Sequence, residues 1–258
     1  MDIITFNANG IRSAARKGFF SWLENQQADL VCIQETKAWE LQLTDAIFHP
    51  RGYYRYIYDA QKKGYSGTAI YSTQQPNAVH KGLGFDICDD EGRWLQVDFD
   101  HLSVVSLYMP SGSSSDEKQQ RKFAFMDALT PILKDMQADP AREYIICADW
   151  NICHTELDLK NWKSNQKNSG FLPEERQWMD VLLTSGGFTD VFRALHPEKA
   201  IYTWWSNRGN AYANNVGWRL DYQLTTSGLR DKATKAWVYT DQKFSDHAPV
   251  VISYQMEV

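Results

Sequence analysis

Acidic and amide side chains stand where several apolar, strand-like runs of this sequence stop. The pair Asp246 and His247 places an acid beside an imidazole just before the apolar run 250–254. Other strand-like runs end at, or contain, a polar group able to do chemistry: Asn7, Glu35, Tyr108, Asp149 with Asn151, and Asp221. Because ligands of open sheets gather at strand ends, we expect these side chains to meet in one site.

This set of residues offers mainly oxygen ligands. It holds carboxylates, amides and one phenol, but no thiol and only one imidazole, that of His247. Such donors suit hard cations, and Mg²⁺ is usually held by one or two carboxylates together with substrate phosphate oxygens. Each residue taken alone is better explained as a turn residue or a solvated strand end, and Tyr108 as a core residue. Their recurrence along the chain predicts a metal-dependent phosphoesterase.

The elements that carry these residues alternate between strands and helices. We expect strands at residues 3–6, 30–33, 68–72, 94–99, 102–108, 144–148, 219–224, 237–239 and 250–254. Two of them, joined by Asp100 and His101, should form a hairpin, whereas the N-terminal strand–helix–strand order indicates a crossover unit. This mixture predicts one α/β domain over residues 1–258, built on mixed sheets.

Three stretches have helical periodicity. Residues 13–25 carry apolar side chains on one stripe, and Ser13 is positioned to cap that helix. Residues 116–136 form a second stripe, which Pro131 should kink or split. A third helix begins at Pro173, and its apolar face is expected to consist of Trp178, Val181 and Leu182.

The composition is that of an ordinary globular protein. Of the 258 residues, 43% are hydrophobic and 23% are charged. The net charge of −5 excludes a generic DNA-coating protein, which would be basic. Neither a secretory signal nor a bilayer-spanning run is visible, and Cys147, Cys153 and His154 lack the further ligands of a zinc site. We expect a cytoplasmic protein that contacts no membrane.

Seven segments, in order along the chain, resemble the motifs of the exonuclease III family of AP endonucleases. They are FNANGIR at residues 6–12, QETK at 34–37, YMP at 108–110, ADWN at 148–151, KNSGF at 167–171, GWRLDY at 217–222 and SDH at 245–247. Deoxyribonuclease I-like enzymes, inositol polyphosphate phosphatases and sphingomyelinases share the Asn, Glu and Asp-His signatures. The segments KNSGF and GWRLDY are not expected in those broader relatives.

The resemblance implies a four-layer α/β sandwich, in which two mixed β-sheets pack face to face and helices cover the outer faces. It also implies an enzyme that uses Mg²⁺, with Mn²⁺ as a substitute, and acts on double-stranded DNA. Such enzymes cleave the backbone 5′ to an abasic site and leave a 3′-hydroxyl, and many also trim blocked 3′ ends. We expect a monomer, which suffices for this activity.

The resemblance also assigns residues to the metal and to the attacking water. Glu35 would bind the metal first, with Asp246 and Asn7 as direct or water-mediated partners. Asp149 would orient and deprotonate the attacking water, and Asn151 would hold that water or a phosphoryl oxygen. Both Asp149 and Asn151 are therefore expected close to the metal as well.

The remaining motif residues are expected to act on the phosphate. His247 would donate a hydrogen bond to a non-bridging oxygen, while Asp221 would fix the orientation of the imidazole and favour its charged form. Tyr108 would donate a further hydrogen bond. Asn9 stands where some members of the family have Asp, so its share in the metal site is open.

A second group of residues is expected to bind the substrate. Trp204, Trp218 and Leu220 match positions that wall the family's sugar pocket, with core packing as the alternative for Trp204. Ser169 is small where a large side chain could obstruct that pocket, which favours cleavage at true abasic sites. The other substrate-binding candidates are Lys167, Asn168 and Arg208.

The expected DNA-binding surface departs from the family in one loop. Ser111 stands where many relatives have Asn, and the loop 111–115 has no arginine to wedge into DNA. Arg208 could act from the other side, although a solvated loop arginine is the alternative. A basic rim is expected to contact backbone phosphates, and its members are Arg12, Arg16, Lys17, Lys160, Lys163 and Lys167.

Three other functions stay open on the sequence alone. The first is an enzyme that acts mainly as a 3′-phosphatase, 3′-phosphodiesterase or exonuclease and incises abasic sites weakly. The second is a non-catalytic nucleic-acid-binding regulator, which should have lost some of the catalytic carboxylates or the imidazole. The third is a sugar-phosphate or lipid phosphatase, which would need neither DNA nor the set of pocket tryptophans.

Overall fold

Apolar segments of the chain assemble into two six-stranded sheets. The computed structural model describes residues 1–257, and within them the first sheet has the order β13 (Ala233–Val238), β14 (Val250–Tyr254), β1 (Asp2–Asn7), β2 (Leu30–Gln34), β4 (Thr68–Ser72) and β3 (Tyr54–Tyr58). The second has the order β5 (Ala78–Lys81), β6 (Trp94–Asp98), β7 (Leu102–Tyr108), β8 (Glu143–Asp149), β12 (Asp221–Thr226) and β9 (Phe188–Asp190). Both sheets mix parallel and antiparallel pairs, as predicted.

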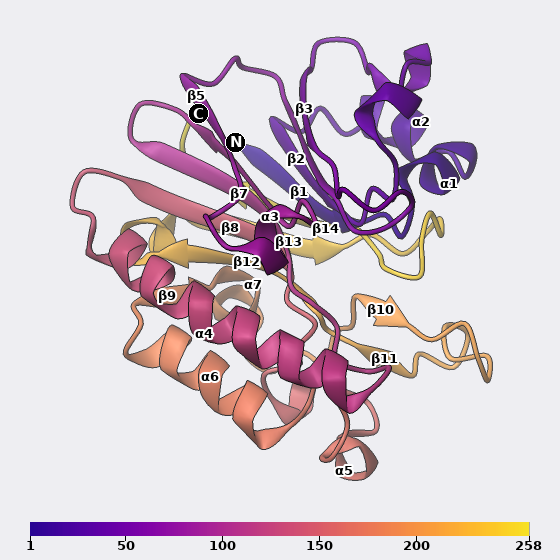
Figure 1. The fold of residues 1–258 in the computed structure, drawn as a ribbon, viewed down its shortest axis with the longest axis vertical. Coiled ribbons are helices and arrows are strands. Elements are labelled where there is room, and N and C mark those ends of the chain that lie inside the picture. Colours follow the sequence, from indigo (N-terminus) through magenta and orange to yellow (C-terminus); the bar gives the residue numbers. More distant parts are fainter. Residues whose placement is uncertain (258) are drawn as a thin grey trace.

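Helices cover the outer faces of the two sheets (Figure 1). On the first sheet these are α1 (Ile11–Arg16) and α2 (Phe19–Glu24); on the second they are α3 (Asp86–Asp89), α4 (Asp116–Ala138) and α6 (Pro173–Thr184). The shorter elements are α5 (Trp162–Asn165), α7 (Val191–Leu195) and 3₁₀ turns at Glu40–Gln42, Ala46–Phe48, Glu156–Asp158 and Ser227–Lys232. The expected four-layer sandwich of two mixed sheets is confirmed.

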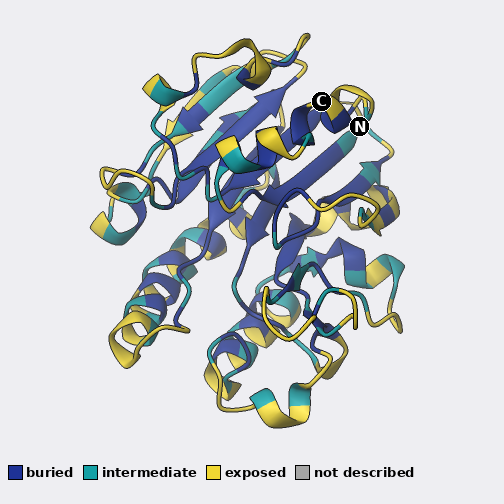
Figure 2. Cartoon of the chain, turned by 90° about the vertical axis from the view of Figure 1, so that its right-hand side faces the viewer, coloured by how far each residue is buried: buried dark blue, intermediate teal, exposed yellow. Residues whose placement is uncertain are grey.

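Strands at the centre of this sandwich are buried on both faces, as the dark blue arrows of Figure 2 show. Successive residues of a strand point to opposite faces. Ile3 and Leu30 therefore enter the core between the sheets, whereas Ile4 and Val31 enter the core beneath α1 and α2. Burial on both faces explains why the sequence shows continuous apolar runs rather than alternation.

Sheet register aligns the ends of the second sheet's strands. The parallel strands β7 and β8 pair Tyr108 with Asp149, and the antiparallel strand β12 places Asp221 opposite the same Asp149. In the first sheet, the parallel strands β1 and β2 pair Asn7 with Gln34, the residue before Glu35. Three strands of the second sheet (β7, β8 and β12) and two of the first (β1 and β2) thus have a polar residue at the end that lies in this region.

The two sheets meet at these strand ends. β1 packs against β8 across the interface between the sheets. A two-stranded ribbon of β10 (Trp204–Trp205) and β11 (Gly217–Trp218) lies next to them, and Trp204 forms an isolated bridge to His247. The expected convergence of strand-end residues into one region is therefore found.

Two of the expected helices differ in the structure. Residues 13–25 do not form one helix, because Gly18 adopts a left-handed conformation with φ of 90° and separates α1 from α2. Ser13 lies inside α1 and is not its cap; Gly10 precedes that helix. In α4 the helix runs without a break past Pro131, so the expected split does not occur, while a kink at that residue stays a prediction. Its buried residues on both sides of the proline hold the helix on the sheet.

Smaller differences concern the third helix and two strands. Val181 was expected on the buried face of α6, but it is 47% exposed, and Met179 is buried there instead. Strand β12 begins at Asp221, so Arg219 and Leu220 precede it. The aromatic stretch after residue 52 also contains a strand, β3, whose apolar residues are too few to stand out in the sequence.

Candidate active site

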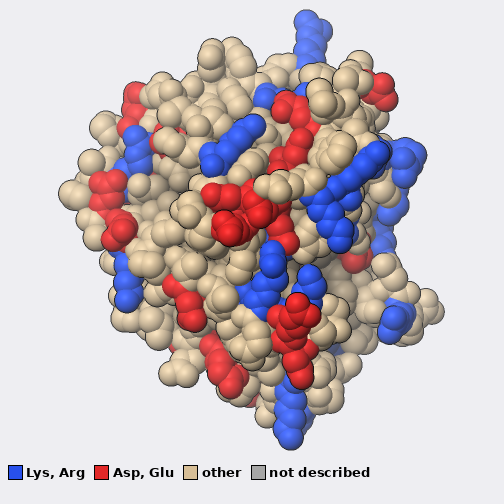
Figure 3. Space-filling view, in the orientation of Figure 1, with Lys and Arg blue, Asp and Glu red and all other residues tan. Residues whose placement is uncertain are grey.

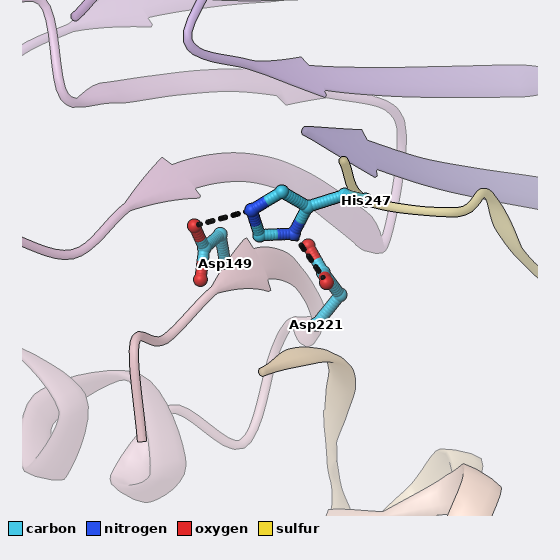
Figure 4. Close-up of side chains that lie close together, drawn as sticks. All are labelled: Asp149, Asp221 and His247. Atoms are coloured by element: carbon cyan, nitrogen blue, oxygen red, sulfur yellow. Dashed lines mark hydrogen bonds and ion pairs between the residues drawn. The ribbon is translucent and has the colours of Figure 1, made fainter. Parts of the chain in front are cut away.

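His247 lies between two carboxylates at the ends of β8 and β12 (Figure 4). Its Nδ1 is 2.8 Å from Oδ2 of Asp221, and its Nε2 is 3.8 Å from Oδ2 of Asp149. All three residues are almost completely buried. The hydrogen bond to Asp221 therefore fixes the ring orientation and leaves Nε2 directed to the side of Asp149.

Burial and neighbouring charges set the protonation of this group. Burial alone would lower the pKa of His247, but the carboxylates of Asp221 and Asp149 raise the pKa of His247 to about 10. Burial raises the pKa of Asp149 to about 7; the charge of His247 opposes that rise, and the charge of Asp221 adds to it. At neutral pH the site thus holds a charged hydrogen-bond donor beside a carboxylate that can accept a proton.

Asn7 connects the two sheets at this point. Its Nδ2 donates to Oε1 of Glu35 at 2.9 Å and to Oδ2 of Asp149 at 2.8 Å, while its Oδ1 accepts from the backbone N–H of Asn9 at 2.9 Å. Asn7 is fully buried. In this orientation it positions two carboxylates, and a direct contact of Asn7 with a metal stays a prediction.

Glu35 and Asp246 present carboxylates to the cleft. Lys37 Nζ lies 2.7 Å from Oε2 of Glu35 and also donates to Oδ1 of Asn9. Burial alone would raise the pKa of Glu35, but the charge of Lys37 lowers it below its ordinary value. The pKa of Asp246 is likewise lowered, against burial, by the charge of His247 and by a 2.9 Å hydrogen bond from Asn9 Nδ2. Both groups are therefore ionised at neutral pH.

The charges and donor atoms of this site fit a divalent cation. The carboxylates of Asp149 and Asp221 each have an oxygen within 4.8 Å of the other and of the His247 ring, and Glu35 and Asp246 add two further carboxylates. The charged imidazole of His247 has no lone pair to offer a metal, so the ligands of this site are carboxylates. Among the described residues, the cations paired with these four carboxylates are the imidazolium of His247 and the ammonium of Lys37. A phosphate entering such a site would meet a surplus of negative charge, which a hard cation bound by carboxylates neutralises.

Tyr108 and Asn151 complete the floor of the cleft. The guanidinium of Arg93 lies 4.6 Å from the ring centroid of Tyr108 and donates to its backbone carbonyl at 2.9 Å. Asn151 Nδ2 donates to the carbonyl of Met109 at 2.8 Å, and its backbone N–H donates to Oδ1 of Asp149 at 2.9 Å. Both side chains are thus held in place by the protein itself.

A cleft of about 900 Å³ opens over these residues. One wall is an apolar cluster of the buried Leu220 and the partly exposed Trp204 and Trp218. The centroids of the two indole rings lie 6.2 Å apart, edge to face. Trp204 Nε1 also donates to Oδ2 of Asp246 at 3.0 Å, which joins this wall to the charged floor. Trp204 therefore lines the cleft and is not simply part of the core.

Most residues expected in the site line this cleft. They are Glu35, Tyr108, Asp149, Asn151, Lys167, Asn168, Ser169, Trp204, Trp218, Leu220, Asp246 and His247. Asn7 and Asp221 are buried directly behind its floor. Arg208 is the exception, because it lies on the exposed loop between β10 and β11 and does not line the cleft. Ser111 does line it, so the loop that departs from the family still borders the site.

Sequence reasoning missed several residues of this region. Lys37 was visible only as part of the segment QETK, without a role, yet it pairs with Glu35. Gln119 lines the cleft from the first turn of α4. Lys122 and Glu175 lie behind the cleft as a buried ion pair. Their sequence surroundings resemble ordinary polar helix faces, so the sequence held no signal for them.

Basic residues flank the cleft on two sides. Arg12 and Arg16 line a smaller hollow of about 450 Å³, and Lys37 borders both that hollow and the cleft. Figure 3 shows Lys and Arg side chains gathered at the right-hand edge of the face drawn there, which is the side on which Figure 1 places α1. Lys160, Lys163 and Lys167 are exposed in the segment around α5. This distribution is consistent with the expected basic rim.

Comparison with known proteins gives the class of this fold and site. The model of the Endonuclease/Exonuclease/phosphatase family matches residues 4–247, and the chain belongs to that family. An exodeoxyribonuclease of Bacillus subtilis (strain 168) is 37% identical over 252 residues, which cover 97% of this chain and 98% of the relative. The expected membership of the exonuclease III type, and with it the expectation of a phosphodiesterase hydrolase, is confirmed.

Solved structures of the same type superimpose closely. An AP endonuclease from Archaeoglobus fulgidus has a TM-score of 0.91 at 29% sequence identity, over 99% of this chain and 100% of that chain. A 3′ phosphatase from Neisseria bound to product DNA hairpin has a TM-score of 0.89 at 26% identity, over 98% of this chain and 99% of that chain.

None of the helices described within residues 1–257 combines the length and the apolar character needed to span a membrane.

Proposed function

We propose that this protein is a Mg²⁺-dependent DNA repair phosphodiesterase that cleaves the backbone 5′ to abasic sites and also trims 3′ ends. The observation that carries the proposal is one cleft with two parts. Its floor holds Asp149 and His247, and its wall holds Trp204, Trp218 and Leu220. A phosphate can lie on the floor of the cleft while a sugar without a base packs against its apolar wall.

The proposed reaction is hydrolysis of one P–O bond. Asp149 takes a proton from a water molecule, whose oxygen bonds to phosphorus while the bond to O3′ of the preceding nucleotide breaks. His247 and Tyr108 donate hydrogen bonds to the non-bridging oxygens as negative charge develops there. Asn151 already donates from Nδ2 to Met109, so it offers Oδ1 to the attacking water. The leaving O3′ takes up a proton from solvent and becomes a 3′-hydroxyl, and Asp149 afterwards releases its proton to solvent.

Glu35 and Asp246 are the residues proposed to hold Mg²⁺. When bound, the ion neutralises the phosphate and the developing oxyanion. The chain prepares this pair: Asn7 orients Glu35, and Asn9 orients Asp246. The hydrogen bond of 2.8 Å between Asp221 and His247 supports a positioning role for Asp221 rather than a role as metal ligand.

Substrate choice is proposed to depend on the shape of the apolar wall. Duplex DNA must release the target nucleotide from the stack before it can reach a recessed site, and an abasic residue leaves the stack at low cost. Trp218 and Leu220 would contact the bare sugar, and the small side chain of Ser169 leaves the entrance open. A nucleotide that still carries its base would be too large for the same space.

The proposal is tested with an end-labelled duplex that carries one abasic site, in the presence of Mg²⁺ or of a chelator. We expect incision 5′ to the abasic site only with Mg²⁺, and no incision of the same duplex with its base in place. A duplex with a 3′-phosphate end is compared in parallel. Efficient removal of that phosphate without incision at the abasic site would instead favour a 3′-end enzyme, the second candidate.

A further inference from the structure

Lys122 of α4 and Glu175 of α6 form a buried ion pair directly behind the cleft. Lys122 Nζ lies 2.5 Å from Oε1 of Glu175, and both side chains have 0% exposure. The same oxygen accepts a further hydrogen bond of 3.1 Å from Nε2 of Gln119, a residue of the cleft lining. In Figure 1 the two helices run side by side across the outer face of the second sheet.

Each member of the pair also holds one side of the cleft. Lys122 Nζ donates to the backbone carbonyl of Asn151 at 2.7 Å. Glu175 Oε2 accepts from the backbone N–H groups of Gly170 at 2.7 Å and Leu172 at 3.0 Å. The pair therefore links the catalytic strand end to the segment that carries Ser169, through hydrogen bonds to main-chain atoms only.

Each of the two linked segments contains a residue with a left-handed backbone conformation. Asn151 has a φ of 51°, which is uncommon outside glycine, and Gly170 has a φ of 90°. A Cβ at Gly170 would lie 3.1 Å from the carbonyl oxygen of Asn151 and 3.3 Å from the indole of Trp218. The segments thus approach closely, and a small shift of either would change the width of the pocket beside Trp218.

An ion pair at this position requires an explanation other than stability. A buried pair contributes little net stability, since an apolar pair of similar volume is often as stable. The carboxylate of Glu175, however, accepts hydrogen bonds from Lys122, Gln119, Gly170 and Leu172. A glutamine in place of Glu175 would have only one oxygen to accept these hydrogen bonds. Its –NH₂ group would then face N–H donors, either those of Lys122 and Gln119 or those of Gly170 and Leu172.

We propose that Lys122 and Glu175 are positioning residues that set the pocket width and thereby select abasic sites as substrates. This inference rests on the proposed function. In incision, the sugar on the 3′ side of the scissile phosphate occupies the pocket held by Glu175. In removal of a 3′-phosphate, nothing follows the phosphate, so that pocket stays empty. The Glu175 side of the pair therefore matters for the first reaction and not for the second.

The test is the ratio of two activities of one protein, each measured as kcat/KM with Mg²⁺. The substrates are an abasic duplex and a duplex with a 3′-phosphate end, and the variants are Glu175→Gln and the double variant Lys122→Met with Glu175→Gln. We expect the ratio of incision to phosphate removal to fall about tenfold or more in both variants, because small misplacements of a substrate-positioning group have large effects. Leu129→Ala, a buried apolar change on the same helix α4, is the control that should leave the ratio unchanged.

Each outcome decides the inference. Loss of folded fraction alone would lower both activities equally, so an unchanged ratio in folded variants overturns the inference and leaves the proposed function intact. If both variants fail to fold, the pair serves the fold and the inference is also overturned. If the unmodified protein removes 3′-phosphates but does not incise abasic sites, the proposed function fails, and this inference fails with it.

Discussion

Asp221→Asn should move the whole pH profile of DNA incision to lower pH. In the structure, Asp221 raises the pKa of two groups, His247 through a 2.8 Å hydrogen bond and Asp149 through its charge. Removing that charge lowers both pKa values. Since the proposed reaction needs an ionised Asp149 and a charged His247, the rising and the falling limb should both shift towards acid.

The expected loss of incision rate follows from the fraction of His247 that is protonated at a given pH. With its pKa at about 10, His247 is about 97% protonated at pH 8.5. If the pKa of His247 returns to its ordinary value near 6.5, only about 1% is protonated at that pH. We therefore expect Asp221→Asn to incise about 100-fold more slowly than the unmodified protein at pH 8.5, with a much smaller difference at pH 6.

The assay is single-turnover incision of an abasic duplex at saturating Mg²⁺ between pH 6 and 9. Asp180→Asn is a matched control, because Asp180 forms a similar 2.6 Å pair with His154 on the surface and should leave the profile unchanged. A uniform loss at every pH, or a loss restored by more Mg²⁺, would refute this reasoning. The second result would identify Asp221 as a metal ligand.

Three further predictions concern stability, DNA binding and metal binding. Burial alone would raise the pKa of Asp158, but Arg219 and Arg193 hold that pKa well below its ordinary value. The ionised Asp158 therefore stabilises the fold fully above about pH 5, and this contribution is lost as the pH falls. Asp158→Asn should lower the free energy of unfolding in urea by about 3–5 kcal/mol at pH 7 and should flatten its decrease towards acid pH. The affinity for abasic duplex should fall steeply with salt, and Arg16→Ala should reduce the slope of log K against log[salt] by about 1; an unchanged slope would remove Arg16 from the interface. Glu35→Gln should raise the Mg²⁺ concentration needed for half-maximal incision by about tenfold or more, and an equal requirement would place the metal elsewhere.

The sheets and the strand-end residues were predictable because burial on both faces leaves a strong trace in the sequence. The run 30–33 is apolar at every position, and it forms most of β2 in the centre of the first sheet. Polar residues that interrupt such runs are conspicuous. For this reason Glu35 and Asp149 stood out as candidate site residues before any coordinates, and the structure places both in one cleft.

Helix details were less predictable because they depend on single positions. Gly18 breaks the expected first helix by its left-handed conformation, which an amphipathic pattern does not reveal. On α6 the buried face includes Met179 and leaves Val181 exposed, which only the packing of the helix in the folded protein decides. A periodic pattern gives the existence of a helix more reliably than its ends or its exact face.

Residues whose role comes from tertiary contacts were not predictable at all. Lys122 and Glu175 have charged neighbours in the sequence, and only the packing of α4 against α6 buries them together. Arg208 illustrates the opposite case, since it was expected to bind substrate but lies on an exposed loop outside the cleft lining, where a contact with DNA stays a prediction. In both cases the deciding information is the relative position of elements far apart in the chain.

The most direct test of the account is incision of an end-labelled abasic duplex by the unmodified protein and by Asp149→Asn, under single-turnover conditions with Mg²⁺. We predict that the unmodified protein leaves a 3′-hydroxyl, which a DNA polymerase extends, and that the folded variant is slower by about 10³-fold or more. Near-normal incision by Asp149→Asn, or a product whose 3′ end cannot be extended, would contradict the account.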